Sequence, residues 1–485
     1  MTARAPLFWA VSGQAVTLVL TFTGSVILAR LLSPREMGVY AVANATVGVI
    51  AILSTLGINS YIIREVKLAS DVLATAFTLN ALINIAIAGM IFFGSYATQL
   101  FVGDAAVGPI LRVLALVPIL SVLEFRPAAM LQRDMAFKPI AVISTMAAGI
   151  VSGVQIILAM RGFSSMSMAY ANIAGVTFRA IVTSVAGWRY VSLRLSLADW
   201  RPITGFGLRM LTIGGVASIA QRASELILAR TLGLVAIGLY SRASTISNLI
   251  FANIYGTATR VVFAKLSQEF RENGQVGETF LRYLELIICI MWPMLIGLAV
   301  LSEPVFDILY GQRWLHAAPV FSLLMIAQFV VLCFGMNWEL FVIHDEIRRQ
   351  TRYEAIRALA GTAVFAIGCL FSIEGAAVGR IVEAAFGLAL YLPHMSRIAG
   401  TKPSQITRVY SRALLVTVAA VLPVFVLMAM SGWRADVSRP LMALCIALGG
   451  TAWLVTLWLI DHALIDEMRK IARALAELVT PRPTA

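Results

Sequence analysis

The sequence predicts an all-α, polytopic membrane protein with about fourteen transmembrane helices. Hydrophobic residues make up 60% of the 485-residue chain and charged residues 13%, whereas a soluble domain is about half apolar and about a quarter charged. The mean hydropathy is +0.86. A phrase that ends one apolar run and begins the next occurs twice, at residues 27–40 and 227–240. Long apolar runs and an internal repeat together indicate a duplicated bundle of membrane helices.

The apolar runs were divided into spans with a window of about 20 residues, the length that crosses a bilayer as a helix. We expect the first run to be retained rather than cleaved as a signal peptide, because it is long, carries polar residues and has an internal counterpart near 227. The expected spans lie near residues 8–28, 38–60, 73–97, 107–130, 139–160, 164–187, 206–229, 235–257, 283–301, 316–342, 356–372, 375–392, 412–430 and 440–460.

The two copies of the repeated phrase share seven identities, which include Arg30 with Arg230 and Gly38 with Gly238. Leucine and alanine match easily by chance in an apolar chain, but arginine and glycine do so less readily. Six expected spans separate the copies, and an even number gives both halves the same orientation in the membrane. The predicted domains are six-helix lobes at 1–203 and 204–400, an appended pair of helices at 401–462, and an amphipathic helix with a tail at 463–485.

The distribution of positive charge predicts the orientation. If the N-terminus is cytoplasmic, the loops and tails on that side carry roughly 23 lysines and arginines, against about 7 on the other side. This bias explains the net charge of +13 without nucleic-acid binding. Both termini are therefore expected in the cytoplasm, and the helix at 463–485 is expected to lie on that membrane surface, with a partner-binding role as the alternative.

Ionised groups at membrane depth are the candidate functional residues, because each costs about 2.5 to 3.5 kcal/mol to place there. Arginines outnumber acids among them, so the bundle interior favours an anionic ligand. A guanidinium group also holds phosphate oxygens bidentately. The candidate diphosphate-binding residues of a wet cavity are Arg126, Arg179, Arg209, Arg222 and Arg380.

Carboxylates beside these arginines are candidates for ion coupling or switching. They are Glu124, Glu225, Glu339 and Glu383. Glu225 and Glu383 each follow an arginine by three residues on a helix, so each pair is either a switch or a static salt bridge, and both interpretations stay open.

Two further arginines belong to the repeated phrase. Arg30 and Arg230 lie at the outer ends of their spans, where they act either as a gate or as anchors at the membrane interface.

Several chemistries have no signature in the sequence. There is no Walker loop, GxSxG elbow or HExxH motif, so we expect neither an enzyme nor a cofactor. The four histidines lie far apart at the ends of spans, which argues against a metal site. The four cysteines lie inside apolar runs, so a disulfide framework is not expected.

Three phrases carry a resemblance to a known family. They are residues 14–16 with 28–40, residues 131–138 (LQRDMAFK) and residues 309–314 (LYGQRW). With them the chain resembles the polysaccharide or oligosaccharide flippases of the multidrug/oligosaccharidyl-lipid/polysaccharide exporter superfamily. The Ala-Arg-Leu-Leu-Ser-Pro sequence at 29–34 is typical of the exopolysaccharide and O-antigen (lipopolysaccharide) branch. The likeness covers the first twelve spans well and the last two loosely.

The resemblance implies a function. It implies a monomeric carrier in the bacterial inner membrane that moves a polyprenyl-pyrophosphate-linked oligosaccharide from the cytoplasmic to the periplasmic leaflet by alternating access, driven by an ion gradient. Implied partners are membrane lipids, a polysaccharide polymerase and the chain-length machinery. The alternatives are a multidrug or cation-coupled exporter of the same superfamily, a flippase for peptidoglycan precursors, and a non-transporting scaffold of a polysaccharide assembly complex.

Overall fold

The computed structural model describes residues 4–55, 57–65, 70–98 and 103–469, which form helices and short connections without a β-strand. Twelve helical stretches of this part are long and apolar enough to cross a membrane. The prediction of an all-α, multi-pass membrane protein is therefore confirmed, although the count of fourteen is not. The expected spans at 206–229 and 235–257 fall in one continuous helix, and the span at 356–372 lies in a helix that arginines make too polar for this criterion.

The chain forms two compact units, which we describe separately. Unit 1 comprises residues 1–241 and 369–373, and unit 2 comprises residues 242–368 and 374–485. The boundary falls within one long helix, α10 (Trp200–Asn273). The predicted lobe boundary at 203/204 stays a prediction.

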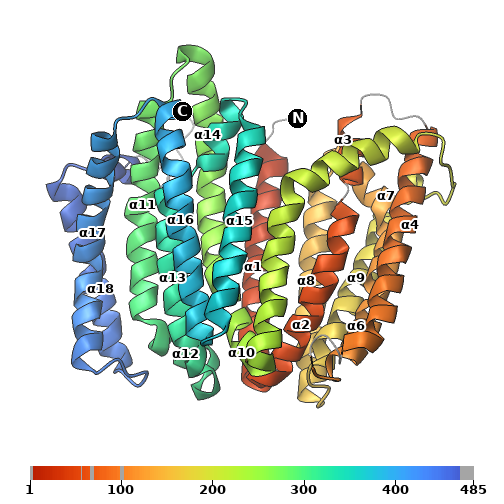
Figure 1. The fold of residues 1–485 in the computed structure, drawn as a ribbon, viewed down its shortest axis with the longest axis horizontal. Helices are drawn as coiled ribbons and strands as arrows, with labels where there is room; N and C mark the ends of the chain where they lie inside the picture. The colour runs from red at the N-terminus through yellow and green to blue at the C-terminus, as the bar shows by residue number, and fades with distance from the viewer. Residues whose placement is uncertain (1–3, 56, 66–69, 99–102, 470–485) are drawn as a thin grey trace, which may run out of the picture. The chain divides into compact units, whose positions relative to one another are not determined.

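Unit 1 is built around helix α8, which lies between α1 and α9, while α7 packs against both α4 and α9 (Figure 1). Before α10 its elements are α1 (Arg4–Leu31), α2 (Pro34–Ala51), η1 (Ile52–Thr55), α3 (Ile58–Arg64), α4 (Ser70–Gly94), η2 (Ser95–Ala97), α6 (Val107–Leu114), α7 (Leu116–Arg133), α8 (Phe137–Met160), α9 (Met166–Ala186) and η3 (Trp188–Tyr190).

Unit 2 is built around helix α11, which packs against α13 and α17, and α17 in turn packs against α18. After α10 the elements are α11 (Gly277–Val300), α12 (Ser302–Tyr310), η4 (Gln312–Ala317), α13 (Ala318–Cys333), α14 (Asn337–Ile343), α15 (Ile347–Cys369), α16 (Ile373–Ala399), α17 (Pro403–Met430) and α18 (Arg439–Leu459). Helices α17 and α18 correspond to the expected spans at 412–430 and 440–460.

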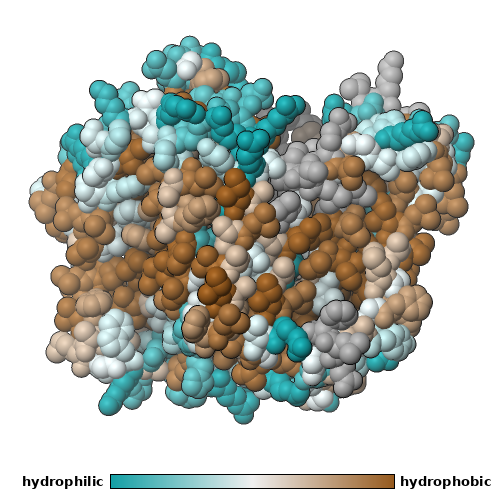
Figure 2. Space-filling model, in the orientation of Figure 1, coloured by the Kyte–Doolittle hydropathy of each residue, from teal (hydrophilic) through white to brown (hydrophobic). Residues whose placement is uncertain are grey.

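The surface of each unit matches a membrane protein. On the visible face, hydrophobic residues cover the middle of the helices and hydrophilic residues gather at their ends (Figure 2). Large apolar side chains such as Phe93, Phe371 and Met430 are at least 74% exposed. Such exposure is unfavourable in water but not in the hydrocarbon of a membrane.

The two copies of the repeated phrase both form a turn between helical segments. In the first copy, Ser33 is the N-cap of α2, and it forms a capping box with Glu36 while Pro34 occupies the first turn. In the second copy, Gly233 takes φ 84° and bends α10 without ending it. Glycine tolerates this left-handed φ. The matching positions 33 and 233 therefore change the chain direction differently, one with a serine N-cap between two helices and the other with a glycine bend inside a single helix.

The matched glycines of the repeat make one close helix crossing inside unit 1. A Cβ atom on Gly38 would lie 1.8 Å from the carbonyl oxygen of Leu234, and a Cβ atom on Gly238 would lie 1.9 Å from that of Pro34. Positions 34 and 38 correspond to 234 and 238 in the repeat, so the contact is nearly symmetrical. Backbones can approach this closely only where both residues lack a side chain.

The predicted amphipathic helix at 463–485 is described only up to residue 469, where residues 463–469 are helical. Leu464 is buried, and Glu467 pairs with Arg282 of α11 at 2.8 Å. Residues 470–485 lie outside the described part of the chain.

The glycine crossing can be tested by adding a single methyl group. We expect Gly38→Ala and Gly238→Ala each to lower the free energy of unfolding by about 1 to 3 kcal/mol, because the Cβ atom collides with backbone. The double variant should lose less stability than the sum of the two single losses, because both substitutions push apart the same pair of helices. Thermal unfolding of the purified protein in detergent measures the effect.

Gly89→Ala is the matched control, because no heavy atom lies within 4 Å of a Cβ atom at this helical position of unit 1. It should leave the unfolding temperature unchanged or raise it slightly. Equal stability of all four variants and the wild type would contradict the crossing.

Candidate functional site

In unit 1, two of the predicted site residues pair with each other across helices. Arg179 of α9 holds Glu124 of α7 with two parallel hydrogen bonds, from Nε to Oε2 at 3.0 Å and from Nη2 to Oε1 at 2.9 Å. No acidic residue lies three or four positions from Arg179 in the sequence. Its carboxylate partner, Glu124, comes from a neighbouring helix instead. A bidentate pair of this kind is strong and orients both groups.

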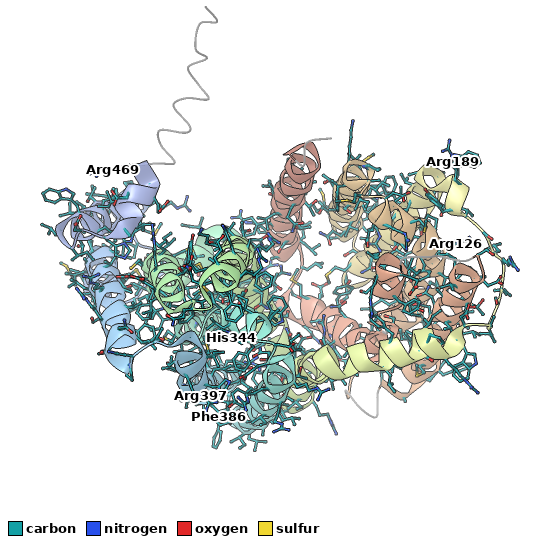
Figure 3. The ribbon with its side chains drawn as sticks, turned by 90° about the horizontal axis from the view of Figure 1, so that it is seen from above. Arg126, Arg189, His344, Phe386, Arg397 and Arg469 are labelled. Atoms are coloured by element: carbon teal, nitrogen blue, oxygen red, sulfur yellow. The ribbon has the colours of Figure 1, made fainter. Side chains whose placement is uncertain are left out.

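Arg126, two residues after Glu124 on α7, has no carboxylate partner in the described part of the chain. Its Nε atom is buried and makes no hydrogen bond. Figure 3, which looks along the helices, shows Arg126 among the helices of unit 1. A half-buried guanidinium without a counter-ion is energetically costly, and an anion bound there would remove much of that cost.

Arg222 and Glu225 of α10 interact at 3.4 Å along one helix face, which is a long and half-exposed contact. The same arginine lies over α2, because a Cβ atom on Gly48 would be 2.8 Å from its Nε atom. Gly48 thus leaves the space that the guanidinium occupies. Arg209 is part of α10, but its side chain lies outside the described part of the chain.

In unit 2, Arg380 and Glu383 belong to a larger ionic network that joins α15 and α16. Glu383 accepts from Arg380 at 2.7 Å and from Arg357 of α15 at 2.6 Å, and Arg357 also holds Glu354 at 2.5 Å. The Tyr391 hydroxyl donates to Glu354 at 3.1 Å. Two arginines and two glutamates balance in charge, so the network neutralises itself.

Small residues make room for this network between the helices. A Cβ atom on Gly361 would lie 2.4 Å from the Cδ atom of Glu383, and one on Gly387 would lie 3.0 Å from the Cδ atom of Arg357. Arg380 also stacks on Phe365, with its Cζ atom 4.4 Å from the ring centroid. The network is therefore packed as well as paired.

Glu339 of α14 differs from the other three candidate carboxylates. Its side chain is buried, with 8% exposed, and it accepts hydrogen bonds from its own backbone N–H and from the hydroxyl group of Thr259 on α10. No lysine, arginine or histidine forms an ion pair with it in the described part of the chain.

Arg30 and Arg230 are both exposed, at the end of α1 and just before the bend at Gly233. A Cβ atom on Gly103 would lie 3.7 Å from Nη1 of Arg230. Whether these arginines act as a gate or as anchors stays a prediction.

Two arginines inside helices were not among the predicted site residues. Arg357, at the start of the span expected at 356–372, lies inside α15 and pairs with Glu383; its spacing of three from Glu354 was the available signal. The phrase at 309–314 packs around Arg242 of α10, whose Cζ atom is 5.6 Å from the Tyr310 ring centroid and 5.8 Å from that of Trp314. No spacing in the sequence could have linked Arg242 to that phrase.

One ionic cluster lies at the end of a span rather than inside it. Glu346, between α14 and α15, contacts His394 at 2.5 Å and Arg349 at 2.9 Å. Burial acts to raise the pKa of Glu346, but the hydrogen bond and charge of His394 and the charge of Arg349 outweigh it, so the pKa lies below its usual value. This cluster is an anchor at a helix end, with its carboxylate ionised at neutral pH.

Comparison with known proteins gives one family and several relatives. The family described as "Polysaccharide biosynthesis protein" matches residues 27–319. A membrane protein encoded in the cps region of Klebsiella pneumoniae is 21% identical over 96% of this chain and 97% of its own length. The succinoglycan biosynthesis transport protein ExoT of Rhizobium meliloti is 24% identical over 66% of this chain and 65% of its own.

A solved structure shares the fold. The inward closed form of the lipid II flippase MurJ superposes with a TM-score of 0.70 over 95% of this chain and all of that one, at 14% identity. This likeness establishes a fold of repeated helical lobes.

The network in unit 2 predicts strongly non-additive mutations. Arg357→Gln removes the arginine that holds Glu354 and leaves Glu383 with Arg380 alone. Glu383→Gln leaves Arg380 without its carboxylate and Arg357 with Glu354 alone, so each change should cost about 3 to 5 kcal/mol of stability. The double variant should be more stable than the sum of the single losses predicts, because it removes one charge of each sign. Thermal unfolding in detergent gives the three values. Strictly additive losses would show that the two side chains do not interact.

Proposed function

We propose that this chain, which belongs to the polysaccharide biosynthesis protein family, is a flippase that moves a lipid-linked oligosaccharide across the membrane for polysaccharide export. The family match carries this proposal. It is supported by a relative named for succinoglycan transport and by the fold that the chain shares with a lipid II flippase. A multi-pass helical membrane protein suits a lipid substrate, because the protein is in contact with both leaflets between which the lipid moves.

The substrate that fits best is a polyprenyl-pyrophosphate-linked oligosaccharide, moved from the cytoplasmic to the periplasmic leaflet of the bacterial inner membrane. The excess of lysine and arginine in one set of loops supports an orientation with both termini in the cytoplasm. A diphosphate carries at least two negative charges, so arginines at membrane depth are its natural ligands.

Arg126 is the observation within the structure that favours an anionic substrate. Its Nε atom is buried without a hydrogen bond, and no carboxylate pairs with it in the described part of the chain, so it can bind a phosphate oxygen without breaking an ion pair. Arg179 and Arg222 would have to exchange Glu124 and Glu225 for the diphosphate. Such an exchange would couple substrate binding to the release of a carboxylate, which suits an alternating-access cycle.

The rival functions fit these residues less well. An exporter of cationic drugs would bind its substrate through carboxylates, but three of the four candidates, Glu124, Glu225 and Glu383, each face an arginine. A non-transporting scaffold would have no use for a half-buried Arg126 that lacks a carboxylate partner in the described part of the chain.

Surface polysaccharide in cells that depend on this chain tests the proposal. Arg126→Ala should lower export about tenfold or more, since a charge-assisted hydrogen bond contributes about 1.5 to 3 kcal/mol. Arg222→Ala and Arg380→Ala should also lower it. Immunoblots of the membrane fraction must show that each variant is still expressed.

Arg189→Ala is the control, because Arg189 is exposed in η3 at the edge of unit 1 (Figure 3), lies over the Trp188 ring and forms no ion pair with a described residue. It should export normally. Normal polymer from Arg126→Ala, Arg222→Ala and Arg380→Ala together would refute the arginine mechanism.

A further inference from the structure

We propose that Glu339 is the proton-binding carboxyl group of this protein, and that Glu124, Glu225 and Glu383 do not take up the proton. The inference deepens the proposed function and rests on it in one respect: proton uptake at Glu339 would then be the step that drives the flippase. Glu339 differs from the other three carboxylates in its burial, in its partners and in the backbone around it.

Burial and the lack of a cation set Glu339 apart. More than nine-tenths of the residue is removed from solvent, and its hydrogen-bond partners, its own backbone N–H and the Thr259 hydroxyl, are both uncharged. An ionised carboxylate in such surroundings would cost several kcal/mol, because no positive charge repays its desolvation. The group avoids that cost by holding a proton.

The other three carboxylates have the opposite surroundings. Glu124 accepts two hydrogen bonds from Arg179, Glu383 accepts from both Arg357 and Arg380, and Glu225 faces Arg222. A guanidinium group offsets the negative charge of its partner carboxylate, so these three side chains have the cation that Glu339 lacks in the described part of the chain.

Glu339 lies beside a break in a membrane helix. Helix α13 ends at Cys333 and α14 begins at Asn337, with Met336 at φ 58° between them. The freed backbone is held by two tyrosines: the Met336 N–H donates to the Tyr255 hydroxyl at 2.6 Å, and the Tyr410 hydroxyl donates to the carbonyl oxygen of Cys333.

A break of this kind can open more easily than an intact helix, because two of its backbone hydrogen bonds go to tyrosine side chains rather than along the helix. The proposal has α14 move at this break, so that the carboxyl group at its third residue meets water in one state of the transport cycle. Glu339 can therefore bind a proton when exposed and carry it when buried.

The titratable groups around the break do not supply a competing charge. On α10 they include Tyr255, which interacts electrostatically with Glu339, and on α13 and α17 they are Cys333 and Tyr410. From α15, Arg357 approaches Phe334 next to Gly387, but it is held by Glu354 and Glu383. The other polar contact from α15 is neutral, an amide hydrogen bond from Gln350 to Asn337.

Infrared difference spectroscopy of the purified protein in lipid tests the proton directly. Spectra recorded at neutral and alkaline pH should show the carbonyl stretch of a protonated carboxylic acid that is lost as pH rises. Glu339→Gln should abolish this change, and the matched variants Glu124→Gln, Glu225→Gln and Glu383→Gln should retain it. Loss of the band in one of these three, or its persistence in Glu339→Gln, would overturn the proposal.

A carbodiimide label supplies a second readout, because dicyclohexylcarbodiimide reacts with protonated carboxyl groups in apolar surroundings. Mass spectrometry should find the adduct on the peptide that contains Glu339, and more of it at neutral than at alkaline pH. Equal labelling of Glu339 and Glu383 would count against the proposal.

Export in cells separates this inference from the proposed function. Glu339→Gln should reduce surface polysaccharide to the level of cells without the chain, and Glu339→Asp should restore part of it. Normal export by Glu339→Gln would overturn the coupling role. If the wild-type chain itself fails to restore export, the proposed function fails, while the infrared band still decides whether Glu339 binds a proton.

Discussion

The energetic cost of charge in hydrocarbon governs the placement of nearly every ionisable group described above. An unpaired ion at membrane depth costs at least a few kcal/mol, so the chain can keep one only where it is neutralised or used. Arg179 with Glu124, and Arg357 and Arg380 with Glu354 and Glu383, meet this requirement by pairing. Arg126 and Glu339 have no such partner in the described part of the chain, and these two carry the functional proposals.

The paired and unpaired groups suit different parts of one transport cycle. A paired arginine can hold an anion only by releasing its acid, so substrate and carboxylate compete for it. An unpaired arginine can bind at once, and an unpaired acid can carry a proton without disturbing an arginine. Competition at some sites and free binding at others are what an ion-coupled carrier of an anionic lipid requires.

The sequence was sufficient for the fold class and for the ion pairs that lie along a single helix. Apolar runs predicted the membrane helices because burial in lipid demands about 20 apolar residues, and the repeat identified Gly38 and Gly238 as matching positions. It could not show that these glycines touch, because a contact between α2 and α10 depends on tertiary packing.

The partners of the charged residues were predictable only along a helix. The spacing of three found Arg222 with Glu225 and Arg380 with Glu383, whereas the pairing of Arg179 with Glu124 joins two helices and has no signature in spacing. Arg357 was not singled out because its partner Glu383 lies on another helix, although its spacing of three from Glu354 within α15 was visible in the sequence. The unpaired state of Arg126 and Glu339 likewise emerges only when every neighbour is known.

The most direct measurement is translocation by the purified protein in liposomes that carry a fluorescent polyprenyl-pyrophosphate oligosaccharide, with a membrane-impermeant quencher reporting the outer leaflet. The account predicts that the wild-type chain makes the lipid accessible far faster than protein-free liposomes do, and that Arg126→Gln slows this exchange. Exchange no faster than in protein-free liposomes, under the same ion gradient, would contradict the claim that this chain is a flippase.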